Sequence, residues 1–369
     1  MANTNLHKAK EAKNDEFYTR MEDVSEELKH YREHFKDKIV LCNCDDPTWS
    51  AFWKHFHLNF EFLGLKKLIS THYDKVNPTY KMVYEGGNDG DTDVGEKIAL
   101  QGNGDFRNEE CIELLKEADI VVTNPPFSQY REYVKQLVDY NKKFIIWSNN
   151  NSITYKEIFP LIKENKMWLG YIANKTCYFQ IPDSYKKWDE KYTKEKDDGH
   201  KYGKVPAISV FTNLDIKKRH DPLIKELWRK YYDYYNEDGS LKEGKEDYFP
   251  KYDNYDAINV NKVTDIPIDY YGVMGVPITF LDKFNPDEFE ILGSSVSDNL
   301  SFRLEKHYAK NDCKFVKADG FSVSNSGALR DKTSPKILGK GNGDYAITPQ
   351  GTFFHSIYDR IFICKKKRT

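Results

Sequence analysis

A polar tetrapeptide, Asn124-Pro125-Pro126-Phe127, ends the short β-branched run Asp119–Val122 and has the residue types for one kind of chemistry. The two prolines fix the backbone and remove two hydrogen-bond donors, so a strand must stop before them and leave Asn124 at its carboxyl edge. Open α/β sheets bind their ligands at that edge. An amide, rigid main-chain carbonyls and an aromatic ring can hold a planar base by its exocyclic amine and stack on its face. These residues favour methyl transfer to an amine of a nucleic-acid base.

The flanking sequence supports this interpretation over a simple turn with a buried Phe, which the four residues alone would favour. Asp119–Val122 is typical of a buried parallel strand. After Ser128, apolar residues recur at the spacing of an amphipathic helix: Tyr130, Tyr133, Val134, Leu137 and Val138. The tetrapeptide is therefore predicted to lie in a rigid polar loop between a strand and a helix.

Methylating the exocyclic amine of adenine is difficult because the nitrogen lone pair is conjugated with the ring. The side-chain carbonyl of Asn124 and the main-chain carbonyl of Pro125 could accept the two amine protons and direct the lone pair at a methyl donor. Positioning and preorganised dipoles would then supply most of the rate, without a strong general base. Stacking of Phe127 on the base is expected to contribute about 1–3 kcal/mol.

The methyl donor needs a second site on the same sheet edge, and S-adenosylmethionine is the expected donor. Asp105, within Gly104-Asp105-Phe106, follows a predicted strand and could accept a hydrogen bond from the adenine amine of the donor. A turn residue that stabilises Gly102–Phe106 is an equally good reading of Asp105 from spacing alone.

Two further segments could hold the donor. Asp45 and Asp46 follow the first strand, where the methionine part or the ribose would lie. Asp46 precedes Pro47 and is predicted to be a helix N-cap, so Asp45 is the better functional candidate. The polar and aromatic segment Asn14–Thr19 precedes the first helix, and ordinary capping would also explain it.

Composition bounds the remaining possibilities. The chain has 369 residues with 39% hydrophobic and 15% aromatic content, enough for one large or two ordinary globular domains. The formal net charge is −2, so the overall charge does not indicate a polyanionic partner, although a local patch could bind one. Six cysteines lack a C-x-x-C pair or clustered histidines, which predicts neither a metal site nor disulfides. No signal or membrane segment is recognised, so a cytoplasmic protein is expected.

Predicted strands alternate with amphipathic helices, a pattern typical of an α/β fold with a doubly wound, mostly parallel, Rossmann-like sheet. The predicted strands are Lys38–Leu41, Leu68–Tyr73, Lys97–Leu100, Asp119–Val122, Phe144–Trp147 and Val205–Leu214. Beyond Asp215 the pattern changes to tyrosine-rich runs interrupted by Pro and Gly. We therefore place a domain boundary after residue 215.

The carboxyl-terminal residues are basic. From Arg330 to Thr369 there are nine Lys or Arg against three Asp, and Lys365–Arg368 is the densest run. A solvated tail and a set of phosphate contacts explain this excess equally well.

At this level of detail the sequence resembles the adenine-specific DNA methyltransferases of the EcoRI modification methylase type. The resemblance covers nearly the whole chain and is carried by these segments: Lys13–Thr19, Leu41–Pro47, Gly104–Phe127, Ile153–Phe159, Lys204–Asp215 and Gly272–Gly293. It implies a class I S-adenosylmethionine-dependent methyltransferase fold, with residues 1–215 as the donor-binding catalytic domain and 216–369 as a DNA target-recognition region.

The resemblance also implies residue roles and partners. Asn124, Pro125, Pro126 and Phe127 would hold an adenine flipped out of double-stranded DNA. The implied donor-binding residues are Phe17, Tyr18, Thr19, Asp45 and Asp105. A monomer is expected, either solitary or paired with a restriction endonuclease that acts on the same site.

Two departures from the wider methyltransferase superfamily stand out. The loop Cys42–Pro47 has no glycine where a glycine-rich loop is usual, and the second strand ends in Ser70–Tyr73 without the usual acidic ribose ligand, for which Asp74 is a candidate. The alternatives are a methyltransferase for an RNA base or a protein glutamine amide, and an inactive DNA-binding relative. The roughly 150 residues after the catalytic half favour a large nucleic-acid target.

Overall fold

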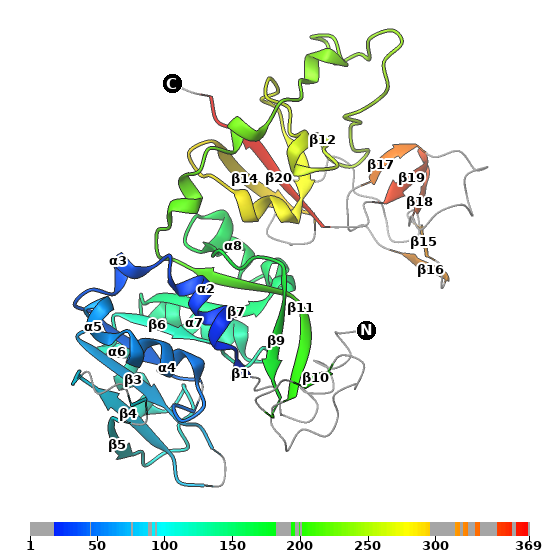
Figure 1. Ribbon diagram of the computed structural model, residues 1–369. Helices are drawn as coiled ribbons and strands as arrows, with labels where there is room; N and C mark the ends of the chain where they lie inside the picture. The colour runs from blue at the N-terminus through cyan, green and yellow to red at the C-terminus, as the bar shows by residue number, and fades with distance from the viewer. Residues whose placement is uncertain are drawn as a thin grey trace. The chain divides into compact units, whose positions relative to one another are not determined.

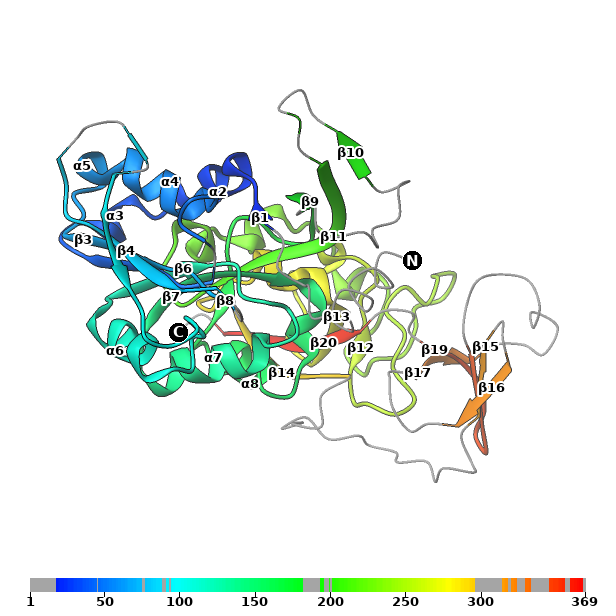
Figure 2. The same cartoon turned by 90° about the horizontal axis from the view of Figure 1, so that it is seen from below.

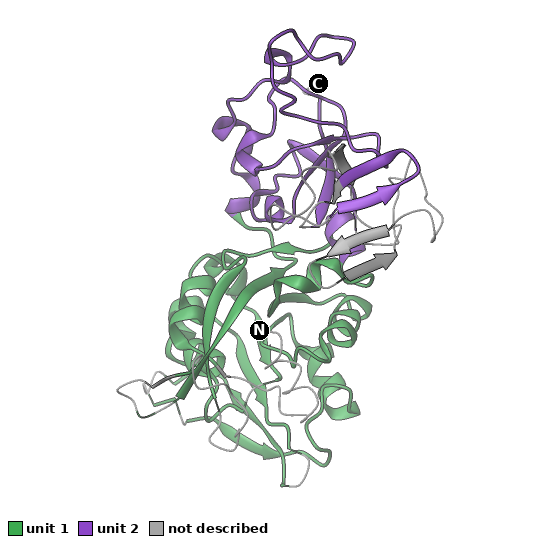
Figure 3. Cartoon of the chain, turned by 90° about the vertical axis from the view of Figure 1, so that its right-hand side faces the viewer, with its two compact units in different colours: residues 1–158, 166–216 green, residues 159–165, 217–369 purple. Residues whose placement is uncertain are grey.

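The chain divides into two compact units in the computed structural model (Figures 1 and 3). Unit 1 comprises residues 1–158 and 166–216, and unit 2 comprises residues 159–165 and 217–369. The structure describes these residues: 18–44, 46–74, 77–87, 91–92, 94–181, 193–195, 199, 201–295, 314–317, 320–323, 329–332, 345–355 and 359–367.

Unit 1 is built on one mixed sheet whose centre is parallel. The parallel strands, in spatial order, are β3 (Lys67–Thr71), β2 (Ile39–Cys42), β6 (Ile120–Thr123) and β7 (Lys143–Asn149). Strands β2 and β6 are buried along their whole length, as expected for a sheet covered on both faces. The predicted α/β fold is confirmed at this centre.

Antiparallel strands extend the sheet on both sides. Beyond β3 lie β4 (Tyr80–Tyr84) and β5 (Glu96–Ala99), and beyond β7 lie β11 (Lys201–Thr212), β9 (Lys175–Gln180) and β1 (Tyr18–Thr19). Two short strands, β8 (Trp168–Leu169) and β10 (Thr193–Glu195), also pair with β11. The strand predicted near residues 97–100 is thus an antiparallel edge strand and not part of the parallel centre.

Helices cover both faces of the sheet (Figure 2). On one face lie α2 (Met21–Leu28), α3 (Arg32–Phe35), α4 (Ala51–Leu58) and α5 (Phe60–Leu63), and on the other lie α6 (Glu109–Glu117) and α7 (Tyr130–Asp139). Their apolar residues recur at helical spacing; in α7, Tyr130, Tyr133, Val134 and Leu137 are all buried. The short 3-10 helix η1 (Asn150–Thr154) follows β7.

Unit 2 contains two smaller sheets. One has the order β12 (Ile258–Asn259), β13 (Met274–Pro277), β20 (Arg360–Lys365) and β14 (Phe289–Ser294). The other has the order β16 (Gly320–Val323), β15 (Lys314–Lys317), β18 (Tyr345–Thr348), β19 (Gly351–His355) and β17 (Leu329–Lys332). The remaining elements are α8 (Phe159–Lys163), η3 (Lys217–His220), η4 (Leu223–Glu226), η5 (Tyr231–Asp233), η6 (Val263–Asp265) and η7 (Ile278–Lys283).

The expectation that Asp46 caps a helix starting at Pro47 is wrong. Helix α4 begins four residues later, and its cap is Ser50, whose hydroxyl accepts from the backbone N–H groups of Phe52 and Trp53 at 3.2 and 3.3 Å. Asp46 instead accepts from the backbone N–H and the hydroxyl of Thr48 at 2.9 and 2.7 Å. This local side-chain turn competes with helix initiation at Pro47.

Two lysines of the basic carboxyl-terminal run have structural partners. Lys365 is the last residue of β20 and is buried, and its ammonium donates to the carbonyl of Ile268. The ammonium of Lys366 donates to the carbonyl of Pro286 at 2.7 Å. These two side chains therefore belong to the packing of unit 2.

A buried carboxylate anchors the segment that leads into β9. Glu27 on α2 has no exposed surface and accepts from the Tyr31 hydroxyl at 2.7 Å and from the backbone N–H groups of Tyr171 and Ile172 at 2.9 and 2.6 Å. A Cβ atom at Gly170 would lie 2.2 Å from the Oε1 atom of Glu27, so the chain approaches the carboxylate as closely as glycine allows.

None of the helices within the described residues is long and apolar enough to span a bilayer.

Glu27→Ala should lower the free energy of unfolding by roughly 2–4 kcal/mol, because it leaves a buried and a partly buried backbone N–H group and a buried hydroxyl without their acceptor. Chemical denaturation measures the change. Glu26→Ala is the matched control on the same helix, because Glu26 is exposed and pairs only with Lys29 at 3.1 Å among the interactions described. It should shift stability by less than about 0.5 kcal/mol. Equal losses in both variants would contradict the anchoring role.

Candidate active site

The strand order reverses direction between β2 and β6. From β2 the chain continues to β3 on one side, and from β6 it continues to β7 on the other. Such a reversal leaves a crevice at the carboxyl ends of the two strands, where ligands bind in open α/β sheets. Asn43 follows β2 and Asn124 follows β6, so both amides emerge at this crevice.

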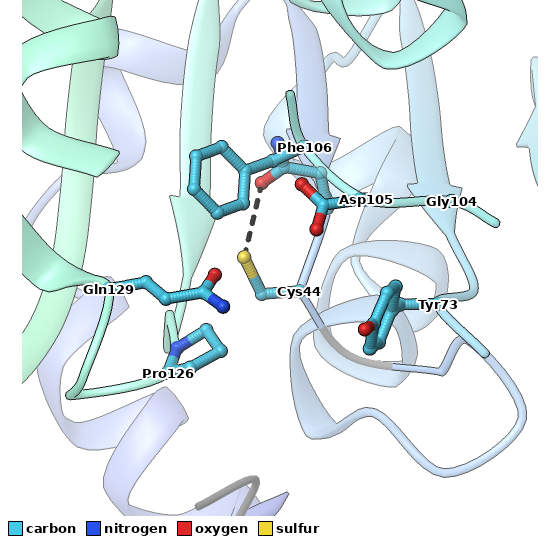
Figure 4. Close-up of a pocket in the computed structure, with 8 residues that line it drawn as sticks. Cys44, Tyr73, Gly104, Asp105, Phe106, Pro126 and Gln129 are labelled. Atoms are coloured by element: carbon cyan, nitrogen blue, oxygen red, sulfur yellow. Dashed lines mark hydrogen bonds between the residues drawn. The ribbon is translucent and has the colours of Figure 1, made fainter. Parts of the chain in front are cut away.

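A pocket with about 320 Å³ of empty volume lies at this edge (Figure 4). Its lining comes from four loops: Asn43 and Cys44 after β2, Tyr73 after β3, Gly104, Asp105 and Phe106 before α6, and Pro126 and Gln129 after β6. The structure thus brings Asp105 and Pro126, predicted for donor and base, to one pocket.

The N-P-P-F loop has the predicted setting. Asn124 is 7% exposed and Pro125 is buried, whereas Pro126 and Phe127 are half-buried. The carbonyl of Pro126 accepts from the N–H of Gln129 at 2.9 Å, which closes a turn directly before α7. The Phe127 ring packs against the core of unit 1.

Asp105 carries an ion pair that the sequence analysis missed. Its two carboxylate oxygens accept from Nε and Nη2 of Arg107 at 2.7 and 2.6 Å, and Oδ1 also accepts from the Arg107 backbone N–H at 3.0 Å. Burial raises the pKa of Asp105, but the hydrogen bonds from Arg107 outweigh it, so the pKa lies below its ordinary value. Asp105 is therefore a preorganised carboxylate held at the pocket wall by its neighbour.

Gly104 sets the position of this loop. Its φ angle is +72°, and a Cβ atom there would lie 2.1 Å from the main-chain oxygen of His72. Only glycine satisfies both constraints. The loop before α6 therefore lies directly against the loop after β3, and Asp105 and Tyr73 line the same pocket.

Asn43 is a pocket residue that sequence reasoning did not single out. It is 3% exposed, and its Oδ1 atom accepts from the Tyr133 hydroxyl of α7 and from the Cys44 thiol at 3.7 Å. Its Nδ2 atom is buried and has no hydrogen-bond partner among the described residues. Tyr73, Phe106 and Gln129 were likewise missed as lining residues, although Phe106 adjoins the predicted Asp105.

The amino-terminal donor segment is only partly described. Tyr18 and Thr19 form β1, which pairs with β9 through Tyr18↔Gln180 and Thr19↔Phe179. Thr19 is 4% exposed, and its hydroxyl has no hydrogen-bond partner among the residues the structure covers. Phe17 and Asp45, the other predicted donor residues, lie outside the described residues.

Asp46 contacts residues of β4 and of the loop after β3 and is not among the pocket-lining residues. Its carboxylate accepts from the Tyr80 hydroxyl at 2.8 Å and pairs with Nδ1 of His72 at 3.1 Å. The carboxylate of Asp74, the candidate ribose ligand, accepts from the backbone and side-chain nitrogens of Asn77 at 2.9 and 3.0 Å.

No group of three or more His, Cys, Asp or Glu that could hold a metal occurs among the residues described.

Comparison with known proteins places this geometry in context. The model of the family described as "Adenine-specific methyltransferase EcoRI" matches residues 5–363. The Type II methyltransferase M.EcoRI of Escherichia coli is 48% identical over 300 residues, which cover 78% of this chain and 88% of that protein.

Two further relatives come from mycoplasmas. M.MpnI of Mycoplasma pneumoniae is 42% identical over 288 residues, covering 78% of this chain and 84% of its own, and M.MgeORF184P of Mycoplasma genitalium is 37% identical over 330 residues, covering 88% and 94%. Both are named Type II methyltransferases. No solved structure matches the chain significantly.

Arg107→Gln should raise the pKa of Asp105 relative to the parent, because the charge and the side-chain hydrogen bonds of Arg107 are lost while burial and the backbone N–H bond remain. A pH titration of the carboxyl carbon by NMR measures this. In the parent the folded-state pKa lies below the unfolded one, so ionised Asp105 stabilises the fold above the unfolded pKa, and this contribution is lost as the pH falls through the folded pKa. The variant should lose part of this stabilisation.

Glu132→Gln is the control for that titration, because Glu132 contacts the other side of Arg107 at 3.3 Å and leaves the Asp105 pair in place. It should leave the pKa of Asp105 below the ordinary value. A pKa of Asp105 that is unchanged from the parent in Arg107→Gln would contradict the assigned cause.

Proposed function

The chain belongs to the EcoRI family of adenine-specific methyltransferases, and from this premise we propose how its residues divide the work of site-specific DNA adenine methylation. The proposed reaction transfers the methyl group of S-adenosylmethionine to the exocyclic N6 amine of an adenine flipped out of duplex DNA. The observation that carries this proposal is the position of Asn124–Phe127 directly after β6, where Pro126 lines the same pocket as Asp105.

The proposed base site uses no strong general base. The side-chain oxygen of Asn124 and the main-chain oxygen of Pro125 would accept the two protons of the adenine amine and so orient its lone pair. Both residues are buried at the sheet edge, where fixed dipoles act in a low dielectric and need no reorganisation. Phe127 would stack on the base.

The described residues fit the proposed donor. S-adenosylmethionine supplies an electrophilic methyl group on a sulfonium. Its polar groups would meet the buried Thr19 hydroxyl and the Asn43 amide nitrogen, which have no hydrogen-bond partner among the described residues. The ionised carboxylate of Asp105 would accept from the donor's adenine amine while Arg107 holds it in place. Phe17, Tyr18 and Asp45 stay proposed donor residues on the family resemblance.

The remaining assignments extend this proposal. Double-stranded DNA is the proposed substrate, residues 1–215 the donor-binding catalytic domain, and residues 216–369 the region that recognises the DNA target. We further propose a cytoplasmic monomer, with a restriction endonuclease of the same specificity as a possible partner in the cell.

Asn124→Ala should lower the methylation rate of duplex DNA by on the order of a hundredfold or more, because one preorganised acceptor of the reacting amine is lost. Asp105→Ala should instead weaken donor binding. Tritium transfer from labelled donor measures the rate, and calorimetry measures donor affinity. Asn151→Ala, which removes an exposed amide from η1, is the matched control and should retain parental activity.

Two outcomes would contradict these roles. Loss of donor binding in a folded Asn124→Ala protein would remove Asn124 from the base site. Transfer by the parent to RNA or to a glutamine-containing peptide, with none to duplex DNA, would overturn the proposed substrate.

A duplex with 2-aminopurine at the target adenine should become more fluorescent when the parent binds, because the base leaves the stack at a cost of a few kcal/mol. Phe127→Ala should weaken this signal and slow methylation, whereas Phe127→Trp keeps a stacking ring and should largely preserve the rate. Donor affinity measured in parallel controls for damage to the pocket. Parental rates in Phe127→Ala would exclude the stacking role.

A further inference from the structure

Strands β9 and β11 continue beyond the parallel centre of the sheet as a two-stranded arm, defined here as residues 175–180 and 201–205 (Figure 1). Strand β11 pairs with β7 from Ile208 to Thr212. On the other side of a register shift between Val205 and Ile208, it pairs with β9 and the short β10 but no longer with β7. The arm therefore projects past the carboxyl end of β7, on the side of the sheet where the N-P-P-F loop lies.

Backbone conformation at the base of the arm is unusual in both strands. Ala207 within the bulge has a φ angle of 58°, and Asn174 directly before β9 has a φ angle of 51°. A left-handed alanine is uncommon and costs about 1–2 kcal/mol. Bulges of this kind redirect a strand and occur often beside active sites. The fold therefore maintains a costly bend that determines where the arm's side chains lie.

Phe179 is the side chain on the arm that reaches the N-P-P-F loop. It is 1% exposed, and the centroids of the Phe179 and Phe127 rings lie 6.5 Å apart with an interplanar angle of 88°. This edge-to-face geometry is the favourable one for two aromatic rings. Phe127 is half-buried, so its position depends on the partner it packs against.

The same residue is tied to the donor segment. Phe179 is the pairing partner of Thr19 in β1 and of Gly203 in β11. Strand β1 has only two residues and, within the described chain, pairs only with β9. Such a short edge strand has little stability of its own, so a ligand that binds Thr19 would also stabilise its pairing with Phe179.

We propose that Phe179 is a positioning residue that couples the donor site to the base site. Donor bound at Tyr18–Thr19 fixes β1 against β9, β9 fixes the ring of Phe179, and that ring holds Phe127 in the orientation that receives the flipped adenine. The proposal rests on the function proposed above and adds to it an energetic link between the two ligands. Such a link must be reciprocal, and typical links amount to 5–150-fold in affinity.

The test compares Phe179→Leu with Phe211→Leu. Phe211 lies on β11 outside the arm and is fully buried, and its ring centroid lies 5.7 Å from that of Tyr130 on α7. Both variants therefore remove one buried ring from the neighbouring strands β9 and β11. Phe211 contributes no described contact to Phe127. Thermal melting of both variants, and of the milder Phe179→Met, establishes that the compared proteins are folded.

The readout is the affinity for duplex DNA with 2-aminopurine at the target, measured with and without saturating S-adenosylhomocysteine. In the parent this unreactive product should tighten DNA binding at least fivefold and enhance the fluorescence. Phe179→Leu should reduce that ratio to near one and lower kcat, with donor affinity changed less than twofold. Phe211→Leu should keep the parental ratio.

Three results would overturn the inference: no coupling in the parent, a parental ratio in Phe179→Leu and Phe179→Met, or equal loss of coupling in Phe211→Leu. Failure of the proposed function is recognised separately, because the parent would then transfer no methyl group to adenine in duplex DNA. A parent that methylates adenine without coupling its two ligands would refute only the role of Phe179.

Discussion

Asp119 fixes the amino-terminal ends of β2 and β6 against each other through two hydrogen bonds. Its backbone N–H donates to the carbonyl of Ile39, and its carboxylate accepts from the N–H of Ile39, both at 2.9 Å. The register that follows pairs Val40 with Ile120 and Leu41 with Val121. Because these strands are parallel, fixing one end determines which residues emerge at the other. A slip of one residue would turn the side chains of one strand to the opposite face of the sheet and shift Asn43 relative to the N-P-P-F loop.

Local sequence patterns were sufficient to predict the parts of the fold that depend on neighbouring residues. The strand predicted at Asp119–Val122 corresponds to β6 (Ile120–Thr123), and the helix predicted after Ser128 corresponds to α7. The order of the strands depends on long-range pairing, so the antiparallel position of β5 and the projecting β9–β11 arm could not be read from these patterns. Asp46 shows that local patterns can also fail within a single loop. It was predicted to cap a helix, but its carboxylate contacts Thr48, Tyr80 and His72 instead.

The sequence predicted where the site lies but not which side chains within it contact each other. Asp105 and Asn124 reach one edge because each follows a strand, and that can be inferred from residue order alone. The bidentate pair between Asp105 and Arg107 depends on how two side chains turn within a short loop, and the bond between Asn43 and Tyr133 joins residues separated by 90 positions. The helical periodicity predicted that Tyr133 lies on the buried face of α7, and it does. Its hydroxyl also donates to Asn43, which lines the pocket. A residue predicted only as core therefore also orients a pocket amide.

The loop after β2 has no glycine, and a close backbone approach that requires glycine occurs instead in the loop before α6. In dinucleotide-binding folds, glycines in the first loop allow the backbone to approach the ligand closely. Here that loop has side-chain amide and thiol groups at Asn43 and Cys44, and the close backbone approach occurs at Gly104, against the main-chain oxygen of His72. The steric requirement for glycine thus applies to the loop before α6. Because Asp105 follows Gly104 directly, the contact that requires glycine also fixes the carboxylate at the pocket wall, and the first loop is free to present polar side chains instead of bare backbone.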